Sequence, residues 1–172
     1  MAHIILIKND YPDHLSLNRT LNYIFRSGIV GGYAVDPNHA YQQMLAVKTA
    51  FQKTGGVVLK HFVISFTNNE SYQLSPDDAL TLAFEVGKTF QYFQLAYALH
   101  LDTSKMHLHF ILNPVSFVDG RKYSEGIGGF LRVKALLDEW FPKSSNQIKW
   151  SDPKSSLNKY SESLDDDFLT IY

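Results

Sequence analysis

The 172-residue sequence contains no cysteine. Disulfide bonds and thiolate metal ligands are therefore excluded, and the absence fits a reducing compartment. The sequence also has no apolar run that approaches the roughly 18 residues of a membrane span. The apolar stretch at its N-terminus is too short for a signal peptide, so we expect a cytoplasmic protein that does not insert into membranes.

The chain also lacks a strong excess of charge of either sign. Its 16 basic and 17 acidic residues give a net charge of −1 at pH 7, whereas nucleic-acid-binding domains are often strongly basic. Four of the acidic residues lie in the last eleven positions, and without them the balance is 16 basic against 13 acidic residues. The charge balance by itself neither predicts nor excludes a nucleic-acid partner.

Apolar residues make up 45% of the chain and aromatic residues 14%, which is typical of a folded globule and not of a disordered chain. A chain of this length suits one domain with a substantial core. After Pro142 the composition changes to serine, asparagine and lysine. We therefore predict a folded domain over residues 1–142 and a loosely structured tail over residues 143–172.

Hydrophobic periodicity and turn residues predict alternating strands and helices. Ser16 is expected to cap the first helix, and a glycine-rich turn is expected at residues 28–32. Two strands follow each other directly around residue 104, which forces antiparallel pairing there. The pattern predicts an α+β fold with a mostly antiparallel central sheet and helices packed on one face of it. The expected strands are 3–8, 57–66, 94–102 and 107–117, and the expected helices are 17–27, 36–53, 75–92 and 130–141.

Three histidines lie within ten residues, at His100, His107 and His109. The alternation of apolar residues on both sides of residue 104 predicts a β-hairpin, in which every second side chain shares a face. With the turn centred on residues 104 and 105, His100 lies opposite His109, and Asp102 lies opposite His107. Opposed residues have Cβ atoms about 5 Å apart. Three imidazoles and a carboxylate on one patch suit a divalent metal ion with open coordination positions.

Each of these residues also has a plainer interpretation. The histidines are compatible with an ordinary hairpin, although three of them on one face are unusual. Asp102 either begins the turn or accepts a hydrogen bond from a ligand histidine, which would fix the tautomer of that histidine. The two roles of Asp102 are compatible with each other.

The segment 100–124 resembles the metal-binding motif of conjugative relaxases, the relaxase and mobilisation nuclease family within the HUH endonuclease superfamily. The family pattern of a histidine, an aspartate and a His-x-His pair is matched without a gap by His100, Asp102, His107 and His109. An apolar run, Asn113 and residues 115–119 continue the match. The resemblance implies the ferredoxin-like palm of HUH enzymes as the fold.

The resemblance also implies an activity. Relaxases nick one DNA strand at a transfer origin through a 5′-phosphotyrosyl intermediate and rejoin it, during mobilisation of a plasmid or an integrative conjugative element. Implied partners are single-stranded origin DNA and the accessory DNA-binding and coupling proteins of a conjugation system, in a bacterial cytoplasm. The implied cofactor is a divalent metal ion, with Mn²⁺ or Mg²⁺ in use, although three imidazoles also accept Zn²⁺, Ni²⁺ or Co²⁺.

In this family the attacking tyrosine lies in the first helix, and the matching residue here is Tyr23. The residue pattern supports that choice. On a helix of residues 17–27, Tyr23 lies roughly 140° from the centre of the apolar stripe, on the same side as Arg19 and Arg26. Guanidinium groups bind phosphates through paired hydrogen bonds, so this face suits DNA. The stripe consists of Leu17, Leu21, Ile24 and Phe25, and the alternative nucleophiles are Tyr33, Tyr41 and Tyr123.

Other residues are weaker candidates for the site. His61 precedes an apolar strand end that resembles a second family motif, and it either assists proton transfer at the phosphate or is a strand histidine satisfied by its neighbours. Asn113 either binds DNA or holds the hairpin backbone. Arg121, Lys122 and Tyr123 form a basic and aromatic cluster that suits single-stranded DNA or an ordinary solvated turn.

Three other functions are compatible with parts of the sequence. A rolling-circle replication initiator of the same superfamily usually has its tyrosine after the metal motif as Tyr-x-x-Lys, a pattern that does not follow His109. A JAMM metallopeptidase requires seven residues between His-x-His and Ser-x-x-Asp, but only six separate His109 from Ser116. A non-catalytic, metal-stabilised DNA-binding module fits the same histidines.

Overall fold

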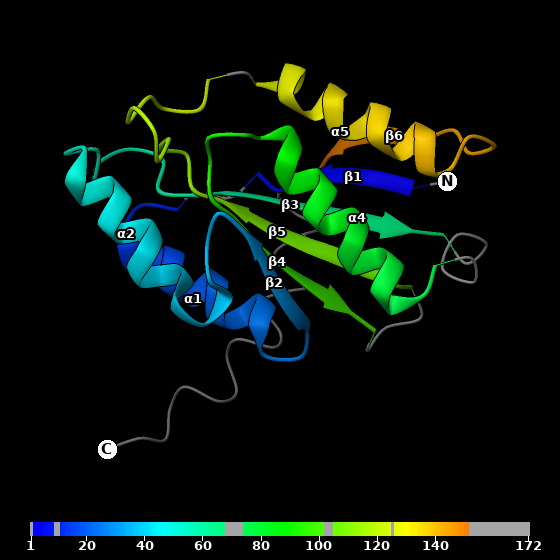
Figure 1. The fold of residues 1–172 in the computed structure, drawn as a ribbon, viewed down its shortest axis with the longest axis horizontal. Helices are drawn as coiled ribbons and strands as arrows, with labels where there is room; N and C mark the ends of the chain where they lie inside the picture. The colour runs from blue at the N-terminus through cyan, green and yellow to red at the C-terminus, as the bar shows by residue number, and fades with distance from the viewer. Residues whose placement is uncertain (1, 9–10, 68–73, 102–104, 125, 152–172) are drawn as a thin grey trace.

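The computed structural model describes residues 2–8, 11–67, 74–101, 105–124 and 126–151. Within these residues, strands and helices alternate along most of the chain (Figure 1). The strands are β1 (Ala2–Leu6), β2 (Ile29–Tyr33), β3 (Lys60–Phe66), β4 (Leu95–His100), β5 (His107–Leu112) and β6 (Gln147–Trp150). The helices are α1 (His14–Phe25), the short 3-10 helix η1 (Pro37–His39), α2 (Ala40–Ala50), α4 (Pro76–Thr89) and α5 (Ile127–Trp140).

The six strands form one sheet in the order β2-β4-β5-β3-β1-β6. All neighbouring pairs are antiparallel except β1 and β6, which run parallel. The fold is therefore α+β with a mostly antiparallel sheet, as the sequence predicted, and it fits the palm of HUH enzymes. The predicted hairpin of β4 and β5 occupies the centre of the sheet, with β3 beside it.

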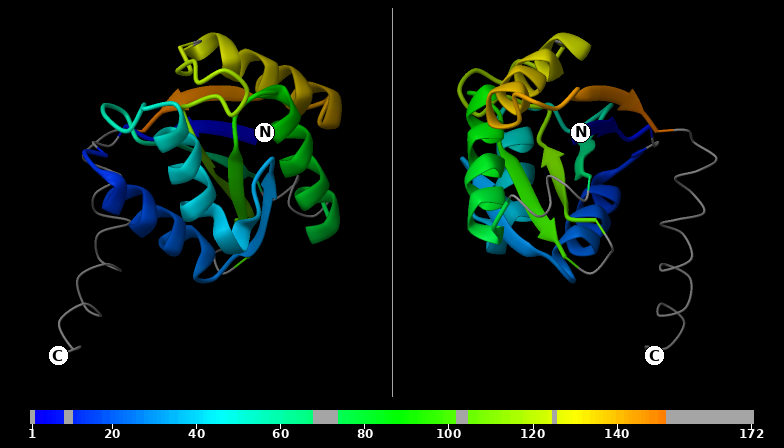
Figure 2. Two further views of the ribbon diagram at one scale, coloured as in Figure 1. Left: turned by 60° about the vertical axis from the view of Figure 1, so that its left-hand side comes forward. Right: turned by 90° about the vertical axis from the view of Figure 1, so that its right-hand side faces the viewer.

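Helices cover both faces of the sheet (Figure 2). Helices α4 and α5 pack on one face, whereas α1 and α2 pack on the other. The expectation of helices on a single face was wrong. The reason is visible in β4, whose residues are all buried, and in β5, where only the first residue is partly exposed. Strands that are apolar on both sides need cover on both sides.

The face under α4 and α5 carries an aromatic core. The ring of Phe62 in β3 stacks on that of Phe110 in β5, with centroids 4.6 Å apart. Phe90 and Phe130 contact Phe62 from the helix side. Burial of one such side chain contributes roughly 1.5–3 kcal/mol. This face therefore supplies much of the hydrophobic stabilisation of the fold.

The face under α1 and α2 carries smaller apolar side chains. Ala96 and Ala98 of β4 and Ile111 of β5 lie beneath Leu17 and Leu21 of α1. Because alanine side chains are short, helix α1 lies close to the strands. The same face carries the histidines of β4 and β5.

The first helix begins earlier than predicted. Its N-cap is Asp13, and not Ser16. One carboxylate oxygen of Asp13 accepts hydrogen bonds from the backbone N–H and from the hydroxyl of Ser16, both at 2.8 Å. An aspartate in this position satisfies N–H groups that the first turn leaves without partners.

The glycine-rich segment after α1 is a strand, and not the predicted turn. It forms β2, which pairs with β4 from Ile29 opposite Leu99 to Tyr33 opposite Leu95. A Cβ atom on Gly31 would overlap the ring of Tyr97 on the neighbouring strand. Glycine is therefore needed at position 31 because the ring of Tyr97 lies so close to the backbone. Glycines inside strands often mark such close approaches.

Other element boundaries differ from the predictions by a few residues. Asp36 caps the second helical segment as expected, but this segment starts as η1 and is α-helical only from Ala40. Strand β3 begins three residues later than predicted, and α4 ends three residues earlier. Helix α4 starts at the predicted Ser75, which forms a reciprocal capping box with Asp78.

The first residues of the predicted tail are part of the sheet. Strand β6 pairs in parallel with β1 at the edge of the sheet. The side chain of Asn146 accepts a hydrogen bond from the backbone N–H of Ala2 at 3.0 Å. Such a short, mostly exposed edge strand carries little hydrophobic pattern from which it can be predicted. Residues 152–172 lie outside the described part of the chain. Among the described helices, none has the length and apolar character of a membrane span.

Candidate functional site

The histidine cluster lies at one end of the two central strands. His100 is the last residue of β4, and His107 and His109 lie at the start of β5. One ring nitrogen of each histidine lies within 4.8 Å of those of the other two. The ring centroid of His109 is 4.7 Å from that of His100 and 5.1 Å from that of His107. The structure thus brings together the three imidazoles that the sequence predicted to converge.

The strands pair in a register that differs by two residues from the predicted one. His100 lies opposite His107, and Ala98 lies opposite His109. Side chains alternate with a period of two, so a shift by two residues keeps the three histidines on one face, whereas a shift by one would have separated them. Asp102, which was predicted to lie opposite His107, falls outside the described residues.

Two of the histidines have their tautomers defined by backbone carbonyl groups. Nε2 of His100 donates to the carbonyl oxygen of Ile24 at 2.7 Å. Nδ1 of His107 donates to the carbonyl oxygen of Lys105 at 2.9 Å. A carbonyl oxygen only accepts, so in the neutral rings the lone pair lies on Nδ1 of His100 and on Nε2 of His107. Such hydrogen bonds typically orient histidines that bind metal ions.

The third histidine of the cluster contacts a fourth histidine. Nδ1 of His109 lies 3.0 Å from Nε2 of His61, which comes from β3. Burial lowers the pKa of His109 well below its usual value, and the rings of His61, His107 and His100 lower it further. Burial also lowers the pKa of His61 to about 4. Both rings are therefore neutral at pH 7 and keep a lone pair.

These features fit a divalent metal ion. Metal binding requires neutral imidazoles, and burial keeps His109 neutral without any cost of deprotonation at pH 7. The hydrogen bonds of His100 and His107 leave one nitrogen of each ring with a lone pair for a metal ion. Three histidines on neighbouring strands could hold a metal ion and would leave coordination positions for a substrate.

Helix α1 places Tyr23 beside the cluster. Its ring centroid is 6.1 Å from that of His109, with the two rings nearly perpendicular. The hydrogen bond from His100 to Ile24 fixes the adjacent residue of the helix to β4. Tyr23 is half-buried and packs against the apolar cluster under α1, so it does not point straight into solvent as its helical position suggested.

Arg19 and Arg26, the two arginines predicted near Tyr23, are both exposed on or directly after α1. Arg19 lies one helical turn before Tyr23, and Arg26 follows the last residue of the helix. Exposed guanidinium groups at these positions would be accessible to a phosphate.

Asn113 does not lie at the surface. Its side chain has no exposed area and donates to the carbonyl oxygen of Met44 and to the side chain of Gln94. Its Oδ1 accepts from the backbone N–H of Val115 and from the ammonium group of Lys48. A fully enclosed amide cannot contact DNA, so the expected DNA contact is replaced by its alternative role of holding the backbone after the hairpin.

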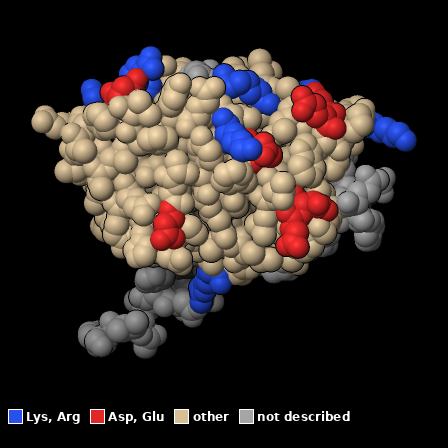
Figure 3. Space-filling view, viewed as in Figure 1, with Lys and Arg blue, Asp and Glu red and all other residues tan. Residues whose placement is uncertain are grey.

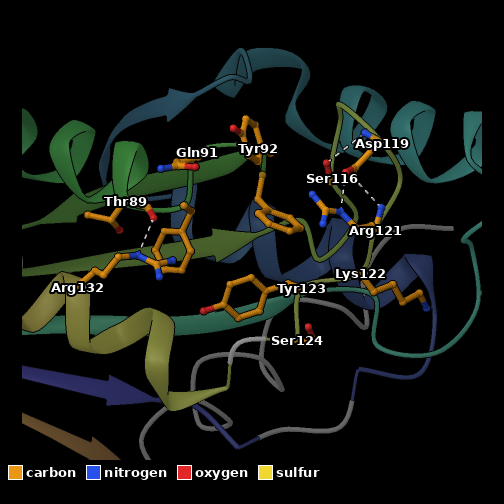
Figure 4. A pocket seen from close by; sticks show the side chains of 12 residues that line it. Thr89, Gln91, Tyr92, Ser116, Asp119, Arg121, Lys122, Tyr123, Ser124 and Arg132 are labelled. Atoms are coloured by element: carbon orange, nitrogen blue, oxygen red, sulfur yellow. Dashed lines mark hydrogen bonds and ion pairs between the residues drawn. The ribbon is translucent and has the colours of Figure 1, made fainter.

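The cluster of Arg121, Lys122 and Tyr123 lies at the opposite end of the hairpin from the histidines. It follows the end of β5, where Leu112 pairs with Leu95. Five residue steps along the strands separate this end from His100, which corresponds to about 17 Å. The three residues line a cavity of about 290 Å³ together with residues of α4 and α5 (Figure 4).

The side chains of this second cluster are also engaged with other groups. Arg121 forms an ion pair with Asp119 at 2.6 Å, and Lys122 donates to the carbonyl oxygen of Gly55. Tyr123 is 7% exposed. Figure 3 shows the side of the molecule that faces the viewer in Figure 1, where charges of both signs are scattered among the described residues. The described residues therefore form no continuous basic surface for a DNA strand on that side.

Sequence reasoning missed two residues near these sites. Tyr11 lies in the segment before α1, and its hydroxyl group is 3.2 Å from Nδ1 of His61. Lys48 of α2 is 1% exposed, and burial, together with the charge of Lys122, lowers its pKa to about 7. Neither residue belongs to a motif, and both contacts join segments at least 50 residues apart in the sequence. No local pattern could have identified them.

Comparison with known families supports the resemblance seen in the motif. The family described as "Relaxase: MobA/VirD2-like, nuclease domain" matches residues 18–141, which contain Tyr23 and all three histidines of the cluster. No curated protein and no solved structure matches the chain.

Proposed function

The chain belongs to the relaxase family, and on that premise we propose that it is a metal-dependent DNA strand transferase with Tyr23 as its nucleophile. It nicks one strand at a transfer origin, keeps the 5′ phosphate on the tyrosine and later rejoins the strand. The cellular process is mobilisation of a plasmid or an integrative conjugative element in the cytoplasm of a bacterium. Accessory DNA-binding and coupling proteins of a conjugation system are its partners.

One observation supports this proposal above the others. The ring of Tyr23 lies 6.1 Å from that of His109, and His109 is a member of the cluster whose ligand atoms lie within 4.8 Å of one another. The tyrosine and the histidines come from segments 77 or more residues apart in the sequence. A phosphate bound at the histidine cluster is therefore within the reach of the phenol.

The reaction is an exchange of one phosphoester bond for another. The hydroxyl oxygen of Tyr23 forms a bond to phosphorus, the bond between phosphorus and the 3′ oxygen breaks, and the proton of the phenol is lost while the leaving 3′ oxygen gains one. The product is a 5′-phosphotyrosyl enzyme and a free 3′-OH. Attack by a 3′-OH on the phosphotyrosine reverses these steps, because phenolate is a competent leaving group.

The other residues bind and orient the substrate. A divalent cation on His100, His107 and His109 would supply positive charge that polarises the scissile phosphate and offsets negative charge that develops on its oxygens. We propose Mn²⁺ or Mg²⁺ as the ion in use, while three imidazoles also accept Zn²⁺, Ni²⁺ or Co²⁺. Arg19 and Arg26 bind phosphates of the strand next to the nick.

The other functions suggested by the sequence are less compatible with the structure. Tyr123 follows the metal motif, as a replication initiator would require, but it is buried at the opposite end of the hairpin. Ser116 and Asp119, which a JAMM metallopeptidase would need beside the histidines, lie at that same distant end. There the hydroxyl oxygen of Ser116 accepts from the backbone N–H of Asp119.

The test is the formation of a covalent protein–DNA adduct. The full chain is incubated with Mn²⁺ and a pool of single-stranded oligonucleotides of randomised sequence, and adducts that resist denaturation are separated by electrophoresis. We expect an adduct with the wild-type protein and none with Tyr23→Phe. Tyr41→Phe is the matched control, because Tyr41 is also half-buried against the same apolar cluster.

Other outcomes of this experiment identify the alternatives. An adduct that persists in Tyr23→Phe and is lost in Tyr41→Phe would assign the nucleophile to Tyr41 and contradict our assignment. Binding of DNA without cleavage or adduct by the wild-type protein would instead support the non-catalytic, metal-stabilised DNA-binding module.

A further inference from the structure

A chain of two side-chain hydrogen bonds extends from the histidine cluster to Tyr11. Nδ1 of His109 lies 3.0 Å from Nε2 of His61, and Nδ1 of His61 lies 3.2 Å from the hydroxyl oxygen of Tyr11. The rings of His61 and His109 have centroids 5.2 Å apart and are tilted by 34°. Both nitrogens of His61 are thus occupied by neighbours.

The protons along this chain follow from the chemistry of imidazole. Because Nδ1 of His109 contacts His61, only Nε2 of His109 is left to bind a metal ion, so Nε2 must carry the lone pair. The neutral ring then has its hydrogen on Nδ1, which donates to Nε2 of His61. His61 must therefore carry its own hydrogen on Nδ1, which donates to the oxygen of Tyr11. One choice of ligand atom fixes both tautomers.

We propose that His61 and Tyr11 are positioning residues that hold the ring of His109 in the tautomer and orientation needed to bind the metal ion. This inference rests on the metal site of the proposed function. It replaces the expectation that His61 takes part in proton transfer at the phosphate, because His109 and Tyr11 occupy the two ring nitrogens of His61. Tyr11 in turn fixes the tautomer of His61.

The three ligand histidines differ in the groups that orient them. His100 and His107 donate to backbone carbonyl oxygens, which no substitution of a side chain removes. His109 contacts the side chain of His61, which in turn contacts that of Tyr11. Tyr11 and His61 also line a cavity of about 450 Å³ beside the end of β1 and the start of β3, so water can replace either side chain after truncation. Substitution of His61 or Tyr11 can therefore change the orientation of His109.

The experiment measures the affinity of the metal-free protein for Zn²⁺ by calorimetry. Loss of an orienting partner typically weakens metal affinity 10- to 100-fold, and we expect about that loss for His61→Ala. Tyr11→Phe should weaken binding less, by about 3-fold to 10-fold, because it leaves His61 in place. His61→Gln should recover part of the loss, since its amide oxygen can accept from Nδ1 of His109. His39→Ala, which removes an exposed histidine paired with Asp36, is the control.

A double variant tests whether Tyr11 acts through His61. We expect the double variant His61→Ala, Tyr11→Phe to bind Zn²⁺ no more weakly than His61→Ala alone. In the absence of the His61 ring, Tyr11 has no side chain to orient. Additive losses would show that Tyr11 acts independently and would overturn its role. An affinity of His61→Ala within twofold of the wild type would overturn the whole inference.

The ring nitrogens of the wild-type protein give a measurement that does not depend on any variant folding. In the Zn²⁺-loaded protein, ¹⁵N spectra of the histidine rings should show hydrogen on Nδ1 of both His109 and His61. Hydrogen on Nε2 of His61 would contradict the inference. A wild-type protein that shows the expected tautomers and Zn²⁺ affinities but forms no adduct with DNA would refute the proposed function and leave this inference intact.

Discussion

The two faces of the sheet are built from different kinds of residue. Under α4 and α5 the strands present large apolar side chains, such as Phe62 and Phe110, that fill the space between sheet and helices. Under α1 and α2 they present Ala96 and Ala98, and next to these the histidine cluster. The first face stabilises the fold, whereas the small residues of the second leave room for imidazoles and for the helix that carries Tyr23.

Within a single strand, alternate side chains therefore contribute to different properties: those on one face stabilise the fold, and those on the other form the candidate site. In β5, Phe110 points toward α4 and α5, while its neighbours His109 and Ile111 point toward α1 and α2. A strand that is firmly packed on one side holds its other side chains in place for the proposed reaction. Substitutions on the two faces should therefore change different properties of the protein.

The largest effect is expected for His107→Ala, on the face that carries the histidine cluster. Removal of one of the three proposed metal ligands should lower Mn²⁺-dependent nicking at least about a thousandfold, which corresponds to roughly 4 kcal/mol in the barrier. His107 is partly exposed, so the midpoint of thermal unfolding without metal should change little. Nicking rates and unfolding curves measured on the same preparations test both statements. Undiminished nicking by the wild type in the presence of a chelator would contradict the metal requirement.

Phe110→Ala should have the opposite profile. Phe110 is fully buried and stacks on Phe62, so its truncation should lower the free energy of unfolding by about 3–5 kcal/mol. Molecules that remain folded should still nick DNA, because the histidine face is unchanged. Urea unfolding measures the loss, and Phe84→Ala is the control, since Phe84 is 41% exposed and should cost less than half as much. Equal losses for the two variants would contradict the stabilising role of this core.

Lys48 should make stability depend on pH. Its pKa in the folded protein is about 7, compared with a usual value of 10.5. Between these values the unfolded chain binds more protons than the folded one, so the stability of the fold should rise with pH. The slope should approach about 1.4 kcal/mol per pH unit, and Lys48→Met should remove it.

Urea unfolding at pH 7 and pH 9 measures this slope. Lys53→Met, which removes an exposed lysine shortly after α2, should leave the slope unchanged. If Lys48→Met keeps the wild-type slope, then Lys48 is charged in the folded protein at both pH values.

The smallest effect is expected for Gly28→Ala, which reduces the space beside the histidine cluster. The added Cβ atom would lie 3.0 Å from Nε2 of His100 and 2.8 Å from Cβ of Ala98. We expect the ring of His100 to shift, which should weaken Zn²⁺ affinity several-fold and lower stability by about 1 kcal/mol. Gly128→Ala in α5 has open space around it and should leave affinity unchanged. Wild-type affinity for Gly28→Ala would show that the site adapts to the added methyl group.

The sequence was sufficient to predict which histidines share a face but not how their strands pair. The face depends only on the two-residue period of a strand, while the register depends on the geometry of the turn. The glycines of β2 predict a turn, because glycine is typical of turns and depleted in strands, and only the close approach of the Tyr97 ring explains Gly31. Tyr11, Lys48 and the burial of Asn113 depend on contacts between distant segments, which local patterns do not contain.

The central claim is that the histidine cluster and Tyr23 form one active site, and peptide mapping of the covalent adduct tests it most directly. Trypsin cleaves after Arg19 and Arg26, so residues 20–26 form a peptide in which Tyr23 is the sole tyrosine. We predict that mass spectrometry finds the nucleotide on this peptide after reaction of the wild-type protein with Mn²⁺ and DNA. A nucleotide found on residues 27–48, which contain Tyr33 and Tyr41, would contradict the claim.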